Sequence, residues 1–528
     1  MLSGLPKSSR CQGKVLSCLF RAPKRCQQIR HNGTRSGVAK TSLNSSTQVP
    51  VPLWALIATP TVFGLGFWWS STGSSRSAHG SSWPQVSYAD KRIMLKAADE
   101  ISNAIGEDAV SFDEDTIEDH GYSDWSTSNS LGRPVAVVYP RSTEEVSKIA
   151  QICNKNNVPM VPYGAGSSVE GNFSSPYSGI CIDFTMMDKI IAFHPDDMDV
   201  VVQPGVNWVD LNNRIKHDGL FVPLDPSPTA TIGGMVSTNC SGTNAFRYGT
   251  MKDWVVSVTV VLADGQVIKT RRRPRKTSAG YNLTSLFVGA EGTLGIVTEI
   301  TMKLAVIPQD TSVAVVSFPT IKDAATAATK LIRSGIQLAA LELMDEVQME
   351  VVNRHGSEAV RKTKWDERPT LFLKFSGTTD GIKGDVSRMS LYLYHGWLKS
   401  LVGALSLLTA SMLLINTHTT DASKEDSGKL GLFASVVGHV GDGNFHQAVM
   451  YETDNKLHQQ SVSECVHMMM KRALEMEGTV SGEHAIGIGK KECLMDELGA
   501  DTIHFMKTLK RAVDPKWLMN PGKVFDLP

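Results

Sequence analysis

Three glycine-rich segments, separated by strand-like apolar runs, constrain this chain of 528 residues most strongly. They are Pro162–Ser168 (PYGAGSS), Thr231–Gly249 (TIGGMVSTNCSGTNAFRYG) and Gly289–Val297 (GAEGTLGIV). Glycine lets the backbone turn with positive φ and lets a ligand touch the main chain, and a run of free N–H groups can hold a phosphate. Each segment alone would suit a tight turn. Together they predict one extended ligand that is held mainly by backbone.

Two common phosphate-binding motifs are absent from these segments. A G-x-G-x-x-G fingerprint needs a third glycine at position 169, which is Val169. A Walker A loop needs a lysine where Ile488 follows the interval Gly482–Gly487. The ligand is therefore not expected to sit in a Rossmann or P-loop fold.

A strand, a helix and a strand are predicted to lead into the first glycine segment. Val135–Tyr139 and Val158–Val161 are short apolar runs, and Ser142-x-x-Glu145 is a capping box at the start of the intervening helix. That helix is expected to bury one face, formed by Val146, Ile149, Ala150 and Cys153. Later apolar runs, Val255–Leu262 and Ile296–Leu304, predict further strands.

The segment Gly438–His446 (GHVGDGNFH) carries two histidines around an Asp-Gly pair. Asp-Gly favours a two-residue type I′ turn, which would pair His439 directly with His446 across a hairpin. Their Cβ atoms would then lie roughly 5 Å apart, close enough for both imidazoles to reach one divalent metal. The alternative is two surface histidines that merely flank a hairpin.

Glu483 and His484 place a carboxylate and an imidazole side by side in Ser481–Gly487 (SGEHAIG). On extended chain they would point to opposite faces, so one could bind a metal while the other meets a different partner. A carboxylate as third ligand would leave open metal positions for a substrate.

The formal net charge of zero hides an uneven distribution. The first 89 residues carry ten Lys and Arg and no acidic residue, which leaves 43 basic and 53 acidic residues in the rest. A basic, Ser-rich start predicts a mitochondrial presequence at 1–48. The remaining body is acidic, which disfavours nucleic acid as a partner.

An uncharged run at 49–69 predicts a membrane anchor, because about 20 residues of helix can cross a bilayer core of roughly 30 Å. A Gly/Ser-rich linker at 70–90 follows. The alternative for the run is an apolar linker. The expected location is the mitochondrial inner membrane, with the body facing the intermembrane space.

The body holds five cysteines, Cys153, Cys181, Cys240, Cys465 and Cys493, without any C-x-x-C spacing. Neither a zinc ribbon nor a dithiol redox centre is supported. We expect these residues to be buried as small hydrophobes.

In this order, PYGAGSS, IGGMVSTNCSGTNAFRYG and GAEGTLGIVT resemble the FAD-binding domain of the p-cresol methylhydroxylase/vanillyl-alcohol oxidase superfamily. The resemblance implies an α+β fold with an FAD domain at 91–310. The first segment has Ser167 and Ser168 where some relatives attach the flavin through histidine, so FAD is expected to be non-covalent. The residues implied to bind FAD are Pro162, Tyr163, Gly164, Ala165, Gly166, Ser167, Ser168, Gly233, Gly234, Ser237, Gly242, Glu291, Gly292, Gly295, Ile296, Val297, Asn520 and Lys523.

The C-terminal motifs GHVGDGNFH, SGEHAIGIGK and Asn520–Lys523 (NPGK) resemble the FAD-linked 2-hydroxyacid dehydrogenases. That family implies an α+β substrate cap at 311–528. It also implies His439, His446 and Glu483 as ligands of a divalent metal, zinc or manganese, and His484 as the catalytic base. A base that takes the hydroxyl proton eases hydride removal from the α-carbon, and a metal on the hydroxyl lowers its pKa.

The resemblance is interrupted over 389–430. The family's substrate-carboxylate arginine cannot be placed, because no arginine occurs from Met389 to Lys471. The uncharged run Leu401–Ile415 is open to three interpretations: a divergent segment, a buried core helix or a second membrane span, although it is short for a span.

The resemblance implies oxidation of D-lactate to pyruvate, with electrons passing to cytochrome c. D-2-Hydroxyglutarate, or another D-2-hydroxyacid, is the alternative substrate. Two further alternatives are a non-catalytic flavoprotein and a metal-dependent hydrolase built on the histidine segment.

Overall fold

The computed structural model describes residues 85–400, 421–452 and 455–528. Val86–Leu527 form one compact unit. The segments predicted as presequence (1–48) and anchor (49–69), and the linker up to residue 84, lie outside the described residues. Within the part of the chain that is described, no helix combines the length and the apolar character that crossing a membrane requires.

A four-stranded sheet precedes the first glycine segment, in the order β1-β2-β4-β3. All four strands are short; β1 pairs antiparallel with β2, and β2 and β3 both run parallel to β4. The strands are β1 (Val110–Ser111), β2 (Ala136–Val138), β3 (Met160–Tyr163) and β4 (Ile180–Asp183). The helices around this sheet are α2 (Lys91–Ile105), η1 (Glu107–Ala109), α3 (Glu114–Gly121) and α4 (Thr143–Asn156). Buried side chains of α2 and α4 pack against β2, β3 and β4 in one hydrophobic core.

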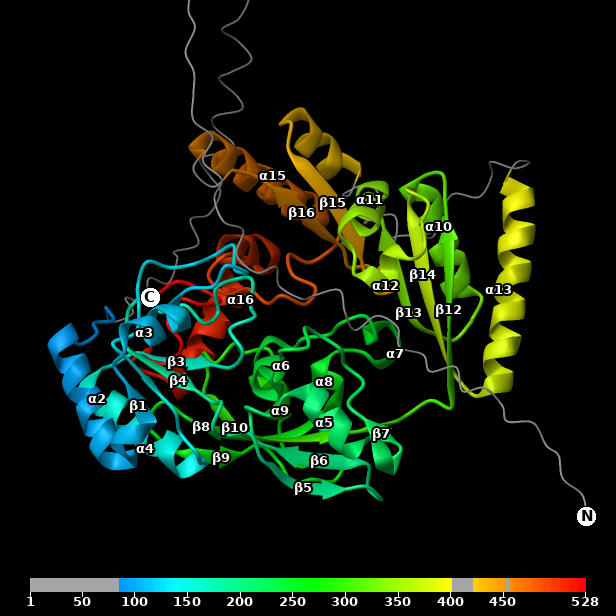
Figure 1. Cartoon of the computed structure of the whole chain (residues 1–528). Coiled ribbons are helices and arrows are strands. Elements are labelled where there is room, and N and C mark those ends of the chain that lie inside the picture. The colour runs from blue at the N-terminus through cyan, green and yellow to red at the C-terminus, as the bar shows by residue number, and fades with distance from the viewer. Residues whose placement is uncertain (1–84, 401–420, 453–454) are drawn as a thin grey trace, which may run out of the picture. The chain divides into compact units, whose positions relative to one another are not determined.

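A second sheet of five strands has the order β5-β6-β10-β8-β9 and is antiparallel throughout. Its strands are β5 (Ile190–His194), β6 (Asp199–Val202), β8 (Val255–Val261), β9 (Val267–Lys269) and β10 (Ile296–Lys303). The short elements beside it are α5 (Trp208–Ile215), η2 (Lys216–Asp218), β7 (Leu220–Phe221), α6 (Ile232–Thr238), α7 (Ala245–Tyr248), α8 (Met251–Trp254), α9 (Thr284–Phe287) and β11 (Ala305–Val306). A separate core forms between these elements and the sheet. The second glycine segment runs through α6 and α7, and the third leads from α9 into β10 (Figure 1).

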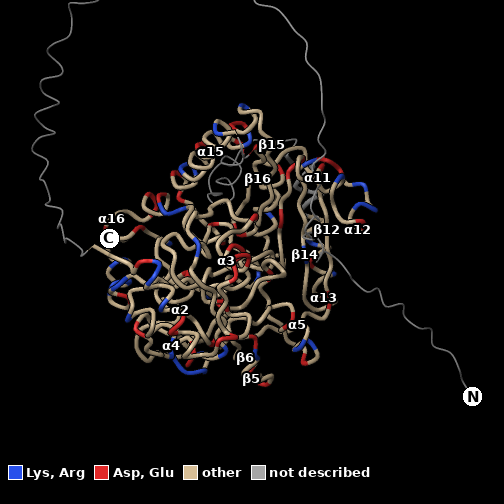
Figure 2. Tube along the Cα trace, turned by 60° about the vertical axis from the view of Figure 1, so that its left-hand side comes forward, with Lys and Arg blue, Asp and Glu red and all other residues tan. Residues whose placement is uncertain are grey.

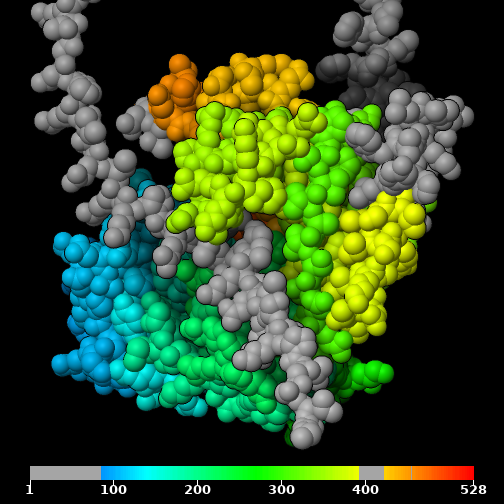
Figure 3. All heavy atoms as spheres, turned by 45° about the vertical axis from the view of Figure 1, so that its right-hand side comes forward, coloured from blue at the N-terminus to red at the C-terminus, as the bar shows by residue number. Residues whose placement is uncertain are grey.

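The third sheet forms the cap, in the antiparallel order β12-β14-β13-β15-β16. Its strands are β12 (Asp310–Ser317), β13 (Leu338–Met344), β14 (Thr370–Gly377), β15 (Phe433–Gly438) and β16 (His446–Met450). Its helices are α10 (Ile321–Arg333), α11 (Glu346–His355), α12 (Glu358–Arg361) and α13 (Thr379–Ser400). Helices α10 and α13 bury apolar side chains on one face of the sheet, and Figure 3 shows α13 in yellow on the outside of the cap.

The last part of the chain returns to the first sheet. Helices α15 (Lys456–Glu475) and α16 (Lys491–Val513) follow the cap strands. Met519 then forms a parallel bridge with Met160, and the Asn520 N–H donates to the Met160 carbonyl (2.8 Å). The C-terminal residues therefore reach the strand that leads into the first glycine segment.

The predicted elements and the α+β class are confirmed with small shifts at their ends. Ser142 caps α4 by accepting the Glu145 N–H, and the four residues of the predicted face are all buried. The capping box is modified, because the Glu145 carboxylate accepts from the N–H of Arg141 rather than Ser142 (2.7 Å). All five described cysteines are free and buried, as expected.

Candidate active site

Two histidines and a glutamate converge at the end of β15. His439 follows β15, His446 begins β16, and Glu483 lies in the loop between α15 and α16. Glu483 Oε1 lies 3.2 Å from His439 Nε2 and 2.9 Å from His446 Nε2. One ligand atom from each residue lies within 4.8 Å of the others. Two imidazoles and a carboxylate in this arrangement are a donor set that suits a divalent metal and leaves room for a substrate.

Glu342 supports this cluster from the neighbouring strand β13. Its Oε2 lies 2.7 Å from His439 Nδ1, the ring nitrogen that faces away from Glu483. A carboxylate on the second nitrogen of a metal-binding histidine fixes the orientation of the ring and raises its basicity. Burial raises the pKa of Glu342, and the bond to His439 opposes that rise only in part.

The electrostatics of the cluster favour a cation between the side chains. Burial lowers the pKa of His439, but hydrogen bonds to Glu342 and Glu483 outweigh it and raise that pKa to about 11. Burial also works against ionisation of Glu483, yet hydrogen bonds from His439 and His446 hold its pKa well below the usual range. Positive charge at this point is thus stabilised by two carboxylates.

His484 lies beside the cluster as a neutral imidazole. Its ring stacks on His446, with centroids 4.8 Å apart and planes at 21°, and its Nε2 lies 3.6 Å from Glu483 Oε1. Burial, and then the positive charge of His446, lower the pKa of His484 to about 4. A neutral ring of this kind can accept a proton. The expectation that Glu483 and His484 face opposite ways is wrong, because residues 482–484 form a bend and Ala485 has a φ of +64°.

The predicted hairpin register is also wrong. His446 pairs with Val437, not with His439, and residues 439–444 form a longer turn in place of a two-residue loop. Tertiary contacts account for the difference: the Gly441 N–H donates to the Leu341 carbonyl (3.1 Å), and a Cβ on Gly441 would lie 2.5 Å from the Phe246 ring. The two histidines still meet, with ring centroids 5.3 Å apart.

The second glycine segment contacts this cluster directly. Ser241 Oγ donates to Glu483 Oε2 at 2.6 Å, although the two residues are 242 positions apart in sequence. The structure therefore brings together at one point two sites that the sequence analysis predicted separately.

The three glycine segments also approach one another. A Cβ on Gly164 would lie 2.7 Å from Thr231 Oγ1, and a Cβ on Gly292 would lie 2.5 Å from Pro162 Cγ. Among the described residues, the buried Thr231 hydroxyl is one of the few side-chain polar groups without a hydrogen-bond partner. An unsatisfied buried hydroxyl is costly unless a ligand completes it. Closely spaced backbone segments and the free Thr231 hydroxyl fit a dinucleotide such as FAD.

The predicted FAD residues differ in solvent exposure: some are exposed or half-buried, and the others are buried. Ala165 and Ser167 are exposed, Gly166 has a φ of +61°, and Pro162, Tyr163, Gly164 and Ser168 are half-buried. Gly233, Gly234 and Ser237 lie on α6 and are also half-buried. The buried residues are Gly242, Glu291, Gly292, Gly295, Ile296, Val297, Asn520 and Lys523.

Several of the buried residues hold the loops in place. A Cβ on Gly242 would meet Asp225, and one on Gly295 would meet Val260, each at 2.6 Å. Lys523 Nζ donates to the Ser174 carbonyl (2.5 Å) and to Asn520 Oδ1 (2.7 Å). Burial lowers the pKa of Lys523 to about 7.

Sequence reasoning missed Glu342 and Ser241. Glu342 lies in the apolar strand LAALELM, where one carboxylate among buried side chains is a signal that could have been used. Ser241 gave no comparable signal, because its partner is reached only through the fold.

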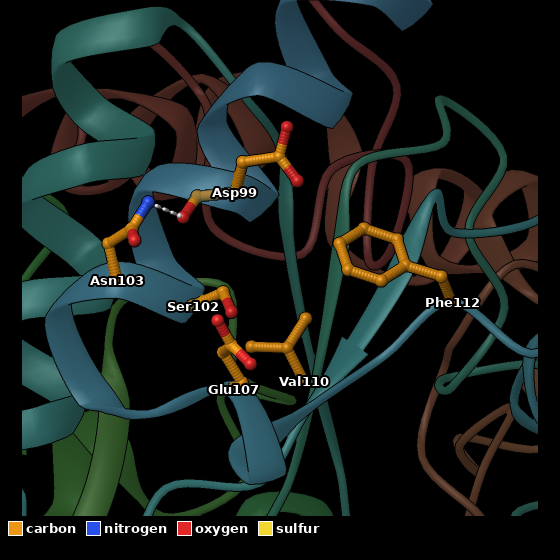
Figure 4. A pocket seen from close by; sticks show the side chains of 6 residues that line it. All are labelled: Asp99, Ser102, Asn103, Glu107, Val110 and Phe112. Carbon is orange, nitrogen blue, oxygen red and sulfur yellow. Dashed lines mark hydrogen bonds between the residues drawn. The ribbon is translucent and has the colours of Figure 1, made fainter.

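A surface pocket at the end of α2 is separate from these residues. Figure 4 shows it lined by Asp99, Ser102, Asn103, Glu107, Val110 and Phe112. Its lining includes none of the predicted site residues.

Comparisons with known proteins match the chain over both parts of the site. Residues 134–271 match the family model described as FAD binding domain. Residues 307–391 and 417–524 match the model described as FAD linked oxidases, C-terminal domain. The stretch between these two matched ranges of the second model, 392–416, lies within the segment predicted to depart from the family.

The similar proteins include mitochondrial enzymes. The chain is 40% identical over 481 residues to "D-lactate dehydrogenase [cytochrome], mitochondrial" of Kluyveromyces lactis, which covers 83% of each protein. It is 40% identical to the protein of the same name from Arabidopsis thaliana, over 79% of this chain and 78% of the relative. Among solved structures, p-cresol methylhydroxylase with substrate bound has a TM-score of 0.67 at 17% identity, over 84% of this chain and 99% of that one.

Proposed function

The chain belongs to the FAD-linked oxidase family, and we propose that it oxidises D-lactate to pyruvate with FAD and passes the electrons to cytochrome c. The observation that carries this proposal is the contact between Ser241 and Glu483, which places the histidine–glutamate cluster against the second glycine segment. Relatives at 40% identity, named D-lactate dehydrogenase [cytochrome], support the choice of substrate and acceptor.

FAD is proposed to bind non-covalently along the three glycine segments. Gly164–Ser168 would hold its diphosphate through backbone, with the free Thr231 hydroxyl close by. Gly233, Gly234 and Ser237 would line its ring system. When bound there, FAD supplies the acceptor for the hydride that leaves the substrate α-carbon.

His439, His446 and Glu483 are proposed to hold a divalent metal, zinc or manganese. A metal there would bind the substrate hydroxyl and carboxylate and lower the pKa of the hydroxyl. Glu342 would keep the His439 ring oriented, and Ser241 would keep the Glu483 carboxylate oriented, through the bonds described above.

His484 is proposed to take the proton of the substrate hydroxyl. Its ring lies at the edge of the cluster, stacked on His446, and it is neutral before the reaction. A base in this position removes the proton as the hydride leaves, which is worth typically 10²–10⁴ in rate. In this assignment three side chains would hold the metal and a fourth would accept the proton, and the four come from two segments, 438–446 and 481–487.

The proposed location is the mitochondrion, with the body held at the inner membrane by residues 49–69 and facing the intermembrane space. The relatives are named mitochondrial. If carbonate extraction of mitochondria released the mature protein into the soluble fraction, the anchor would be wrong.

Cytochrome c is a basic protein, and residues 90–528 carry 53 acidic and 43 basic residues. Figure 2 marks acidic residues in red along the trace at α3, where Glu114, Asp115, Glu118 and Asp119 are all exposed. Charge attraction speeds association and weakens as salt screens it. We expect the second-order rate of cytochrome c reduction to fall several-fold from 20 to 200 mM salt, while the rate with a neutral dye stays constant.

A panel of D-2-hydroxyacids, scored by anaerobic reduction of the bound flavin, tests the proposed substrate. D-Lactate is expected to reduce the flavin fastest, with L-lactate inactive. Faster reduction by D-2-hydroxyglutarate would assign the alternative substrate. A chain that purifies without flavin absorbance would favour the metal-dependent hydrolase, and a flavin that no hydroxyacid reduces would favour a non-catalytic flavoprotein.

A further inference from the structure

The side chain of Glu291 joins the third glycine segment to the loop that carries His484. Glu291 is 5% exposed. Its Oε1 accepts the N–H of Ile486 at 2.8 Å, and its Oε2 accepts the N–H of Gly487 at 2.8 Å. Asn172 also donates its side-chain amide to Oε2. The carboxylate thus holds two consecutive amides that follow His484 almost directly.

The backbone of Glu291 is bonded to two further parts of the site. Its N–H donates to the carbonyl of Ser237 on α6 at 2.8 Å. Its carbonyl accepts from the side-chain amide of Asn520 at 2.7 Å. One residue therefore connects the second glycine segment, the C-terminal residues, the loop after the first glycine segment and the His484 loop.

The conformation of Glu291 indicates that its side chain is needed. Its φ is +53°, in the left-handed region where a side chain strains the backbone. Glycine would take this conformation at lower cost. A buried carboxylate adds a desolvation penalty, since burial raises the pKa of Glu291 to about 7. Both costs are offset by the hydrogen bonds that only a carboxylate at this position provides.

We propose that Glu291 is a positioning residue that fixes the Glu483–His484 loop at its working distance from the flavin-lining segments. This inference rests on the proposed function, because it assigns a role within that active site. It differs from the expectation that Glu291 binds FAD, since both carboxylate oxygens are already bonded to protein N–H groups. Glu291 does not touch the reacting atoms, so its effect reaches them through the position of His484.

Loss of this connection is expected to slow the step in which the substrate loses its proton and hydride. A displacement of about 1 Å in a reacting group can cost 10²-fold in rate. We expect Glu291→Ala to lower the limiting rate of flavin reduction by about 100-fold. Glu291→Gln keeps one oxygen acceptor and should retain part of the rate. The apparent affinity for D-lactate should change less, since the cluster side chains remain.

The experiment uses the purified FAD-loaded, metal-loaded chain, its two Glu291 variants and the control Glu299→Gln. Glu299 lies on β10 of the same domain and pairs with Thr259 and Lys269, away from the His484 loop. Anaerobic stopped-flow mixing measures flavin reduction by D-lactate, and a small dye measures reoxidation. Hydrogen–deuterium exchange measures protection of the amides in residues 481–489, a readout that does not depend on activity.

We expect both Glu291 variants to show slow flavin reduction, with Glu291→Gln faster than Glu291→Ala. Flavin reoxidation and flavin content should be normal, and hydrogen–deuterium exchange at residues 481–489 should increase. The positioning role is overturned if either variant loses its flavin while exchange at 481–489 is unchanged, which would make Glu291 a cofactor ligand. Wild-type rates and exchange in the variants would also overturn it. If Glu291→Ala does not fold, Glu291→Gln decides by the same criteria. If D-lactate does not reduce even the wild-type flavin, the proposed function fails, and the exchange measurement alone decides the inference.

Discussion

The two halves of the proposed site differ in which part of the chain faces the ligand. The glycine segments present backbone, and their few side chains mostly bond to protein, as Ser237 Oγ does to the Gly233 carbonyl. The histidine–glutamate cluster presents ionisable side chains, and the pKa values of His439, of Glu483 and of the adjacent His484 are strongly shifted. Substitutions in the first half should therefore act mainly through steric clashes, and substitutions in the second half mainly through changes in charge. The largest effects on chemistry should come from the cluster, and effects on cofactor binding and stability should come from the glycine segments.

Replacing the proposed base should have the largest effect. His484→Asn is expected to lower the rate of flavin reduction by D-lactate about 10³-fold, because no imidazole remains to take the hydroxyl proton. Flavin content should be unchanged, since His484 lies in the other half of the site. Stopped-flow absorbance measures both. The matched control is His467→Asn on α15; a His484→Asn rate within threefold of the control would contradict the assignment.

Removing the support of a ligand should cost less than removing the base. Glu342→Gln is expected to weaken metal binding 10- to 100-fold, because His439 loses the carboxylate that orients its ring. Isothermal titration with Mn²⁺ or Zn²⁺ measures the affinity. Unchanged affinity would contradict the proposal that Glu342 supports His439 as a metal ligand.

Substitutions at two adjacent glycines should distinguish an effect on FAD binding from an effect on protein packing. A Cβ on Gly233 would lie 2.5 Å from Pro204, so Gly233→Ala should destabilise even the FAD-free protein by about 1–3 kcal/mol. A Cβ on Gly234 would meet Thr231 Oγ1 at an ordinary 3.5 Å, so Gly234→Ala should leave that stability within about 1 kcal/mol. Urea unfolding with and without FAD tests both. If Gly234→Ala also retained FAD as the wild type does, the flavin would not lie against α6.

A pH dependence of stability is expected from Lys523. Its pKa is lowered by burial to about 7, so the unfolded chain binds more protons than the folded chain between pH 7 and 10.5. This contribution to the free energy of unfolding is present above pH 10.5 and is lost as the pH falls through 7. Lys523→Met should flatten this part of the profile. An identical slope in the variant would mean that another group titrates there.

The helices and strands that depend on residues close together in the sequence could be predicted from sequence patterns. The α4 face and its Ser142 cap, and the strands around the glycine segments, follow from periodicity and capping. The convergence of His439 and His446 was also predicted, although by the wrong register. The Asp-Gly pair would favour a tight hairpin alone, but Phe246 and Leu341 hold the turn in another form.

Features that depend on distant contacts could not be predicted from one sequence. Glu342 is 97 positions from His439, and Glu291 is 195 positions from Ile486. The resemblance of the motif around Glu291 to an FAD-binding domain implied a cofactor ligand. Its burial and its N–H partners are visible only when the His484 loop is folded against it.

The central claim is that the backbone half and the charged half serve one reaction. The most direct test is anaerobic flavin bleaching by D-lactate before metal removal, after chelation, and after metal is restored. We predict full bleaching at first, retained yellow flavin without bleaching after chelation, and recovered bleaching with zinc or manganese. Bleaching at the same rate in the metal-free protein would contradict the claim, because the flavin would then work without the cluster's metal.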